Sequence, residues 1–217
     1  MEQTVLAPWQ EKVIAAVAAE PRLANFYLSG GTALAAYHVH HRYSDDLDFF
    51  VYEEKDRIFL HEFALRIQQL LGAGQSRFER LHERNQFFFS VGEEEMKVEF
   101  TRYGFRQLEE PVVRDGIRVD GFRDLAVNKL MAMLDRFDPK DFVDLYFILQ
   151  ERTLEEVRQD AERKFGSKIG DLFLGGELAK VRRIEALPRM IKPLTVDDLK
   201  AFFTERAQEL AAGVLKK

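Results

Sequence analysis

The chain has 217 residues, of which 46% are hydrophobic and 32% charged, and its formal net charge is −5. This length and composition allow a full hydrophobic core, in one domain or in two small ones. A net negative charge argues against a protein that binds nucleic acid over its whole surface, because affinity for the phosphate backbone comes mainly from lysine and arginine.

The sequence contains no cysteine, which excludes disulfides and thiolate metal sites and fits a reducing compartment. No uninterrupted apolar run approaches the ~20 residues that span a bilayer. The N-terminal stretch MEQTVLAPWQ lacks a basic region followed by an apolar block. We therefore expect a cytoplasmic protein without a membrane partner.

The first predicted elements are a helix, a strand and a glycine turn. Apolar residues at helical spacing predict an amphipathic helix over residues 10–19, which Pro21 ends. Residues 26–28 read as a short buried strand, and Ser29-Gly30-Gly31 as the turn into a helix that begins near Thr32. Because glycine has no Cβ, this turn lets backbone N–H groups approach a phosphate closely.

The roles of two hydroxyl side chains stay open at this point. Thr32 is either the N-cap of the helix or a hydroxyl that contacts a triphosphate, and Ser44 has the same two interpretations. Gly30 and Gly31 serve equally as a tight turn with positive φ.

The next strand carries two aspartates two residues apart. Alternation along a strand puts Asp46 and Asp48 on one face, roughly 7 Å apart, while Leu47 and Phe49 face the core. Two carboxylates on one face with no cation between them repel each other, and a bound cation removes that penalty. Hard cations such as Mg²⁺ prefer these oxygen ligands, so Asp46 and Asp48 are the predicted metal ligands.

Further along the chain, a helix is expected over residues 56–71, followed by strands at 77–81, 87–91, 96–103 and 117–119. Asp124 is expected to cap a helix over residues 125–136, and Asp138-Pro139 to begin the next one. Three more helices are expected near residues 156, 180 and 202, the last capped by Thr195.

These elements predict an α/β (α+β) fold. A mixed-sheet catalytic module over residues 1–120 is flanked by helices, and a helical C-terminal region over residues 121–217 forms a bundle packed on it. The stretch 180–192 holds five basic residues and one acid, and it is interpreted as either a docking site for an acidic partner or a solvated helix face.

The order of these motifs resembles the nucleotidyltransferase superfamily, in which Gly-Gly or Gly-Ser and a helix precede Asp-x-Asp on the next strand. The fuller strings GGTAL, HR-x-S and DLDFF resemble the AbiEii/AbiGii toxin family of nucleotidyltransferases. A later lysine and a Lys-Asp-x-x-Asp motif strengthen the resemblance, which covers roughly residues 20–150. The residues that carry it are Gly30 to Leu34, His41, Arg42, Ser44, Asp46 to Phe50, Lys129, Asp141 and Asp144.

The resemblance implies roles for several residues. The superfamily usually has a third carboxylate on a later strand, and Glu99 is the candidate here, either to complete a metal cage or to act as general base. Lys129 would contact nucleotide phosphate, and Arg42 would pair with phosphate beside Gly30, Gly31, Thr32 and Ser44. Asp141 either orients Lys129, as Asp144 also could, or simply complements a helix dipole.

The implied activity is nucleotidyl transfer with Mg²⁺, or Mn²⁺ in its place. A nucleoside triphosphate would give its nucleoside monophosphate to an acceptor hydroxyl and release pyrophosphate. The resemblance further implies a toxin with a separately encoded antitoxin partner and tRNA or another cellular acceptor. Two alternatives stay open, namely a noncatalytic nucleotide- or partner-binding module, and transfer to a small molecule or a protein.

Overall fold

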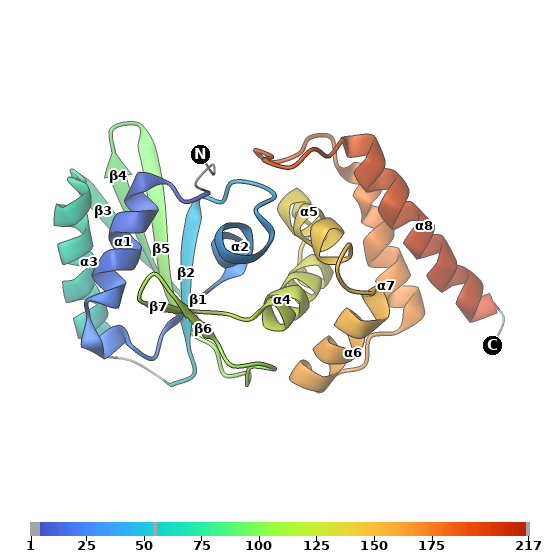
Figure 1. Cartoon of the computed structure of the whole chain (residues 1–217), viewed down its shortest axis with the longest axis horizontal. Helices are drawn as coiled ribbons and strands as arrows, with labels where there is room; N and C mark the ends of the chain where they lie inside the picture. Colours follow the sequence, from blue (N-terminus) through green and yellow to red (C-terminus); the bar gives the residue numbers. More distant parts are fainter. Residues whose placement is uncertain (1–4, 54–55, 216–217) are drawn as a thin grey trace. The chain divides into compact units, whose positions relative to one another are not determined.

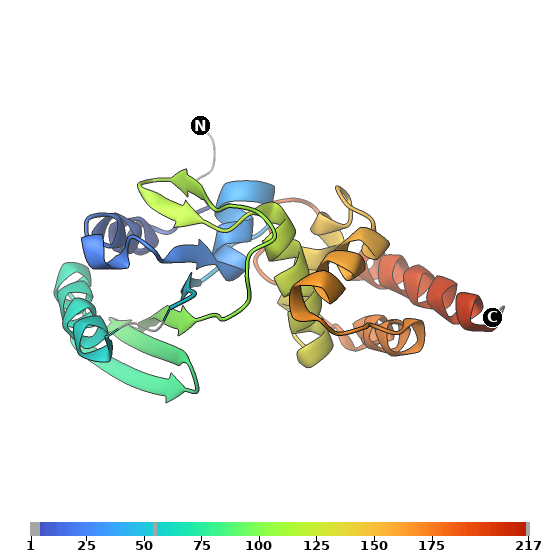
Figure 2. The same ribbon diagram turned by 90° about the horizontal axis from the view of Figure 1, so that it is seen from below.

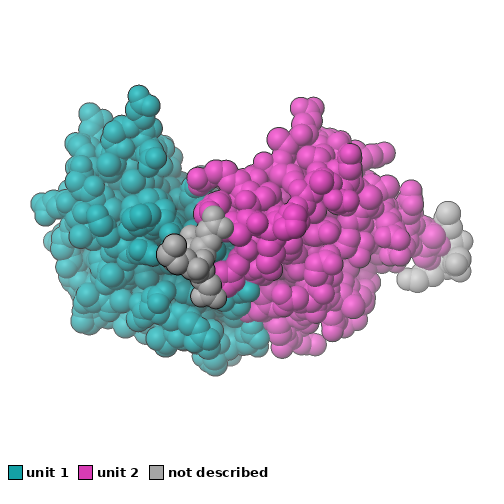
Figure 3. All heavy atoms as spheres, turned by 45° about the horizontal axis from the view of Figure 1, so that its top comes forward, with its two compact units in different colours: residues 1–38, 44–121 teal, residues 39–43, 122–217 magenta. Residues whose placement is uncertain are grey.

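The computed structural model describes residues 5–53 and 56–215. The described residues form two units, one made of residues 5–38, 44–53 and 56–121 and the other of residues 39–43 and 122–215 (Figure 3). Each unit has its own core and its own group of charged residues. No helix in the described ranges is both long enough and apolar enough to cross a membrane.

The first unit is built on a mixed sheet of seven strands in the order β3-β4-β5-β2-β1-β7-β6 (Figure 1). Strand β1 pairs in parallel with β7, and β2 pairs in parallel with β5, while the other neighbours are antiparallel. This confirms the predicted mixed sheet. The strands are β1 (Tyr27–Ser29), β2 (Asp46–Val51), β3 (Gln75–Leu81), β4 (Arg84–Val91), β5 (Glu94–Arg102), β6 (Val112–Arg114) and β7 (Ile117–Val119).

Two helices, α1 (Pro8–Ala18) and α3 (Arg57–Leu71), lie side by side on one face of this sheet (Figures 1 and 2). The ring of Phe63 on α3 lies 5.9 Å from that of Phe100 on β5, which stacks on Phe49 of β2 at 5.5 Å. The apolar stripe of α3 therefore covers this face of the sheet.

Helix α2 (Gly30–Leu34) lies against β2 on the opposite face (Figure 1). The predicted start near Thr32 is two residues late, and the helix passes directly into a π-helical turn over Ala35–Val39. Helix α1 ends at Ala18, before Pro21, as predicted, and a three-residue 3₁₀ turn over Pro21–Leu23 then precedes β1.

The second unit is helical. It contains α4 (Phe122–Asp135), α5 (Pro139–Ile148), α6 (Leu154–Phe165), α7 (Asp171–Leu178), a 3₁₀ turn (Ala179–Arg183) and α8 (Val196–Leu215). The Asp138 side chain accepts a hydrogen bond from the N–H of Lys140 with Pro139 at the first position of α5, and Thr195 accepts from the N–H of Asp198. Both predicted helix starts are confirmed.

Two expectations for this unit are wrong. Helix α4 begins at Phe122, so Asp124 does not cap it; the buried carboxylate instead accepts a hydrogen bond of 2.6 Å from buried Lys164. The stretch 180–192 is not one helix face, since only residues 180–183 lie in a 3₁₀ turn, residues 184–192 form no helix, and Met190 bridges to Arg42.

Candidate active site

The two aspartates of β2 lie on the face of the sheet that α1 and α3 leave uncovered. Asp46 exposes 47% of its side chain and Asp48 exposes 21%, whereas Leu47 and Phe49 between and after them are fully buried. The predicted alternation is confirmed. The pair is thus accessible to a ligand while its strand is anchored in the core.

Strand β5 brings a lysine and a glutamate to the same face. In the parallel register, Asp46 lies opposite Lys97 and Asp48 lies opposite Glu99. The Lys97 ammonium is 3.7 Å from Asp46 and 3.6 Å from Asp48. The expectation that no cation lies between the two aspartates is therefore wrong. Alternation along a strand puts Lys97 on the face of Glu99, but the sequence does not show which strands are neighbours, so the contact with β2 could not be predicted.

Glu99 is buried and fully hydrogen-bonded. Its oxygens accept from Arg84 at 2.5 and 2.7 Å, Gln86 at 2.9 Å and Thr101 at 2.6 Å, and Lys97 lies 3.1 Å away. Burial raises the pKa of Glu99, but these hydrogen bonds and the Lys97 charge outweigh it and lower the pKa to about 2. The geometry therefore makes Glu99 an anchor for Lys97 and Arg84 rather than an open metal ligand or a general base.

Gly30 lies directly against the acidic pair. Its φ is +71°, and a Cβ built on it would lie 2.5 Å from Oδ2 of Asp48. Both facts require glycine at this position. Burial, together with the charges of Glu99 and Asp46, raises the pKa of Asp48 against the opposing charge of Lys97.

The other predicted nucleotide-binding residues of this unit have mixed placements. The Thr32 hydroxyl donates to the backbone carbonyl of Asp46, so it is neither an N-cap nor a free donor for phosphate. Gly31 is partly exposed at the start of α2. Ser44 is half-buried, and its carbonyl accepts from the side chain of Gln10 at 2.8 Å.

The later motifs form a separate buried cluster in the second unit. The Lys129 ammonium lies 3.0 Å from Asp141 and 2.7 Å from Asp144. Both carboxylates are fully buried, and only 10% of the Lys129 side chain is exposed. Burial lowers the pKa of Lys129, but the charges of Asp144 and Asp141 outweigh it and raise the pKa overall. The structure thus brings both predicted acids to the lysine that they were expected to orient.

Arg42 belongs to this cluster and not to an open phosphate site. Its guanidinium donates two hydrogen bonds to Asp144, at 2.6 and 2.8 Å, and a third to the Tyr43 carbonyl. The residue is 2% exposed, and His41 lies 2.7 Å from the same carboxylate. The prediction that Arg42 pairs with phosphate is corrected, because its donors hold the loop to α5.

The donor set on β2 suits a divalent cation that brings further ligands with it. Within residues 5–53 and 56–215, no three His, Cys, Asp or Glu side chains converge closely enough to hold a metal alone. Asp46 and Asp48 supply two carboxylates, which fits a cation that is also bound by the phosphates of a nucleotide.

Two solved structures share the fold of this chain. The chain shares 18% identity and a TM-score of 0.60 with a putative nucleotidyltransferase from Helicobacter pylori, covering 100% of this chain and 98% of that one. A second H. pylori protein, JHP933, matches with a TM-score of 0.58 and 18% identity over 96% of this chain and 91% of that one. This fold, together with a family model that matches most of the chain, defines the class of protein as a nucleotidyltransferase.

A family model then narrows the class. The model described as "Nucleotidyl transferase AbiEii toxin, Type IV TA system" matches residues 13–213, and the chain belongs to that family. An uncharacterised protein of Aquifex aeolicus is 32% identical over 145 residues, which are 65% of this chain and 66% of that protein. The resemblance first seen in the motifs is confirmed over most of the chain.

Proposed function

We propose that this nucleotidyltransferase uses a divalent cation, Mg²⁺ or Mn²⁺, held by Asp46 and Asp48, to transfer a nucleoside monophosphate to a hydroxyl of an RNA acceptor. The observation that carries the proposal is the pair of accessible carboxylates on one face of the sheet. Gly30 lacks a Cβ and so leaves space for the second of them, Asp48. Lys97 of β5 lies 3.7 and 3.6 Å from the two acids, but its single positive charge balances only one of them.

In the proposed reaction the acceptor hydroxyl oxygen bonds to the α-phosphorus, and the bond from that phosphorus to the bridging oxygen of pyrophosphate breaks. The cation would activate the hydroxyl and neutralise the leaving pyrophosphate. Asp46, the more exposed carboxylate, takes the hydroxyl proton, and Asp48 stays against Gly30 as a fixed ligand. Gly30 leaves room for the Asp48 carboxylate, and the partly exposed Gly31 would present its backbone N–H to the phosphates at the start of α2.

The family motif implies a role for Lys129 towards nucleotide phosphate, and we propose this role for the helical unit that holds the lysine. Asp141 and Asp144 hold its ammonium in a fixed, charged state, and Arg42 holds Asp144 in turn. In this scheme Asp141 and Arg42 position Lys129 and do not touch substrate.

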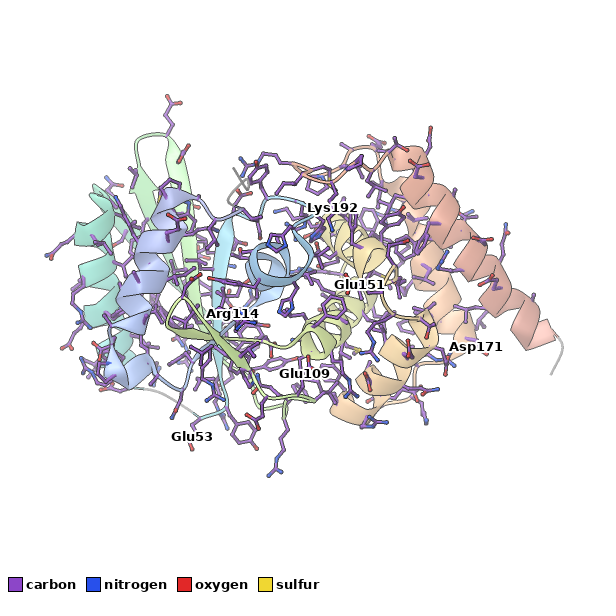
Figure 4. The ribbon with its side chains drawn as sticks, viewed as in Figure 1. Glu53, Glu109, Arg114, Glu151, Asp171 and Lys192 are labelled. Atoms are coloured by element: carbon purple, nitrogen blue, oxygen red, sulfur yellow. The ribbon has the colours of Figure 1, made fainter. Side chains whose placement is uncertain are left out.

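An RNA acceptor, of which tRNA is one, is supported by a basic segment of the second unit. Arg182, Arg183, Arg189 and Lys192 are all exposed in this chain of net charge −5, and Lys192 is labelled in Figure 4. Backbone hydrogen bonds fix the segment, from Tyr43 to the Arg189 carbonyl at 2.9 Å and from Lys192 to the His41 carbonyl at 3.0 Å. Fixed, exposed cations of this kind neutralise backbone phosphates.

The family is described as a type IV toxin–antitoxin system, so we propose that a separately encoded antitoxin is the regulatory partner. Co-expression of the chain with its antitoxin tests the proposed partner directly. Growth arrest by the wild type, relieved when the antitoxin is co-expressed and absent in the Asp46→Ala, Asp48→Ala variant, is the expected result. Arrest that persists in that variant contradicts a toxicity based on transfer.

The experiment for the activity is label transfer from each α-phosphate-labelled nucleoside triphosphate into total RNA, total protein and small-molecule fractions. Label is expected in RNA for the wild type and in no fraction for the Asp46→Ala, Asp48→Ala variant. The matched control is Glu93→Ala, Glu94→Ala, which removes two exposed acids at the β4–β5 turn. Label in the protein or small-molecule fraction would instead show that the acceptor is a protein or a small molecule and not RNA.

A second candidate is a noncatalytic nucleotide-binding module. It is favoured by the placement of Glu99, whose oxygens are fully used by protein donors. Nucleotide binding without transfer to any fraction would support it. Equal binding by the double aspartate variant would also remove the two acids from the nucleotide site.

A further inference from the structure

Lys97 lies among three carboxylates. Its ammonium is 3.1 Å from Glu99, within hydrogen-bond range, and 3.6 and 3.7 Å from Asp48 and Asp46, which are ionic contacts without a hydrogen bond. Only 17% of its side chain is exposed. The Lys97 ammonium is therefore held mainly by Glu99, and its positive charge also acts on Asp46 and Asp48.

Glu99 is well placed to fix that lysine. Four hydrogen bonds from Arg84, Gln86 and Thr101 hold its carboxylate, which is 2% exposed. A carboxylate held this way has a fixed orientation, so the Lys97 ammonium that rests on it is also fixed beside β2. The charge of Glu99 is shared with Arg84, which leaves Lys97 to balance the aspartates.

We propose that Lys97 is a built-in counter-cation of the Asp46–Asp48 pair. It stabilises the two like charges before substrate binds, and it weakens the binding of a bare divalent cation. A cation that arrives on a triphosphate carries compensating negative charge and meets no such barrier. The proposal rests on the proposed function, in that Asp46 and Asp48 are the metal ligands, and it assigns Lys97 the role of making metal entry depend on nucleotide.

Electrostatics gives the expected size of the effect. A unit charge within several ångströms of a divalent cation changes its binding by about tenfold even at the dielectric constant of water. Removing Lys97 should therefore increase the affinity for the bare cation by about tenfold or more. It should also destabilise the protein without metal, because Asp46 and Asp48 then lie side by side uncompensated.

The test is a titration of Mn²⁺ without nucleotide, followed by electron paramagnetic resonance of free Mn²⁺, together with the melting temperature without metal. For Lys97→Met we expect about tenfold tighter Mn²⁺ binding and a lower melting temperature that Mn²⁺ restores. Lys97→Arg keeps the charge and should behave like the wild type. Arg102→Met is the matched control, since Arg102 is on the same strand, exposed and paired with Glu83 at 3.7 Å.

Unchanged or weaker Mn²⁺ binding by Lys97→Met overturns the proposal, as does equal tightening in Arg102→Met. If Lys97→Met does not fold, Lys97→Gln is titrated in its place against the same expectation. Adding Asp46→Asn and Asp48→Asn to the lysine variant should abolish the gained affinity, and its survival would place the cation elsewhere. None of these readouts uses turnover, so they fail independently of label transfer.

Discussion

Replacing Gly30 by alanine should separate activity from stability. Alanine at a φ of +71° costs roughly 1–2 kcal/mol. The new Cβ would also lie 2.5 Å from Oδ2 of Asp48, and real contacts exceed 3.0 Å, so the carboxylate must move by about 0.5 Å or more. Because the group that yields is a side-chain end, this clash adds little to the loss of stability but displaces a metal ligand. Since a misplacement of ~1 Å costs about 100-fold in rate, we expect transfer to fall about 10- to 100-fold.

The matched control is Gly92→Ala in the β4–β5 turn. Gly92 has a φ of +63° and nothing within 4 Å of its virtual Cβ, so alanine there brings the same backbone strain without a clash. Melting temperature and single-turnover label transfer are measured for both variants. Both should melt a few degrees lower, and only Gly30→Ala should lose activity. Equal activity of the two variants would refute the claim that Gly30 is required by the position of Asp48.

Three further outcomes can be measured in the same way. Asp144→Ala leaves the Lys129 charge buried with one carboxylate instead of two, and urea unfolding should show a loss of about 3–5 kcal/mol; a loss under about 1 kcal/mol contradicts the buried network. The depressed pKa of Glu99 contributes stability above pH 4.5 that is lost as pH falls towards about 2, by up to about 3 kcal/mol, so Glu99→Gln should flatten this acid limb in pH-dependent unfolding. If the acid limb of Glu99→Gln is the same as that of the wild type, groups other than Glu99 cause the acid sensitivity. Arg189→Ala, Lys192→Ala should weaken RNA binding and reduce the salt dependence of binding by about two phosphate contacts, whereas an unchanged salt slope removes this segment from the acceptor surface.

Local patterns predicted most of the helices and strands. Period-3.6 apolar spacing located α3, and Gly72 ends it in the left-handed conformation that glycine favours. Strand β6 (Val112–Arg114) was missed because three exposed residues have no alternation to read. Asp124 was misread because its partner, Lys164, lies 40 residues away, and no local rule distinguishes a cap from a buried ion pair.

The roles of the candidate site residues could be predicted where they depend on one strand, and could not where they depend on distant partners. The pairing of Asp46 with Asp48 follows from alternation within one strand, so the sequence predicted it. The environment of Glu99 depends on which strands are neighbours, and the role of Lys97 depends on the register of β2 against β5. Arg42 reads as a phosphate ligand until its partner, 102 residues away, is known. Long-range pairing, which carries no local signal, decided each of these roles.

The five residues 39–43 have a consequence for how the chain can be divided. They connect α2 to the acidic strand, yet they belong to the helical unit, where Arg42 is bound by Asp144 on α5. A single cut after residue 121 therefore leaves Arg42 in one fragment and its carboxylate in the other. Unfolding of the helical unit likewise releases the segment that leads into Asp46. Proteolysis or unfolding of the C-terminal half should therefore abolish the activity proposed for Asp46 and Asp48, although neither residue is itself cut or replaced.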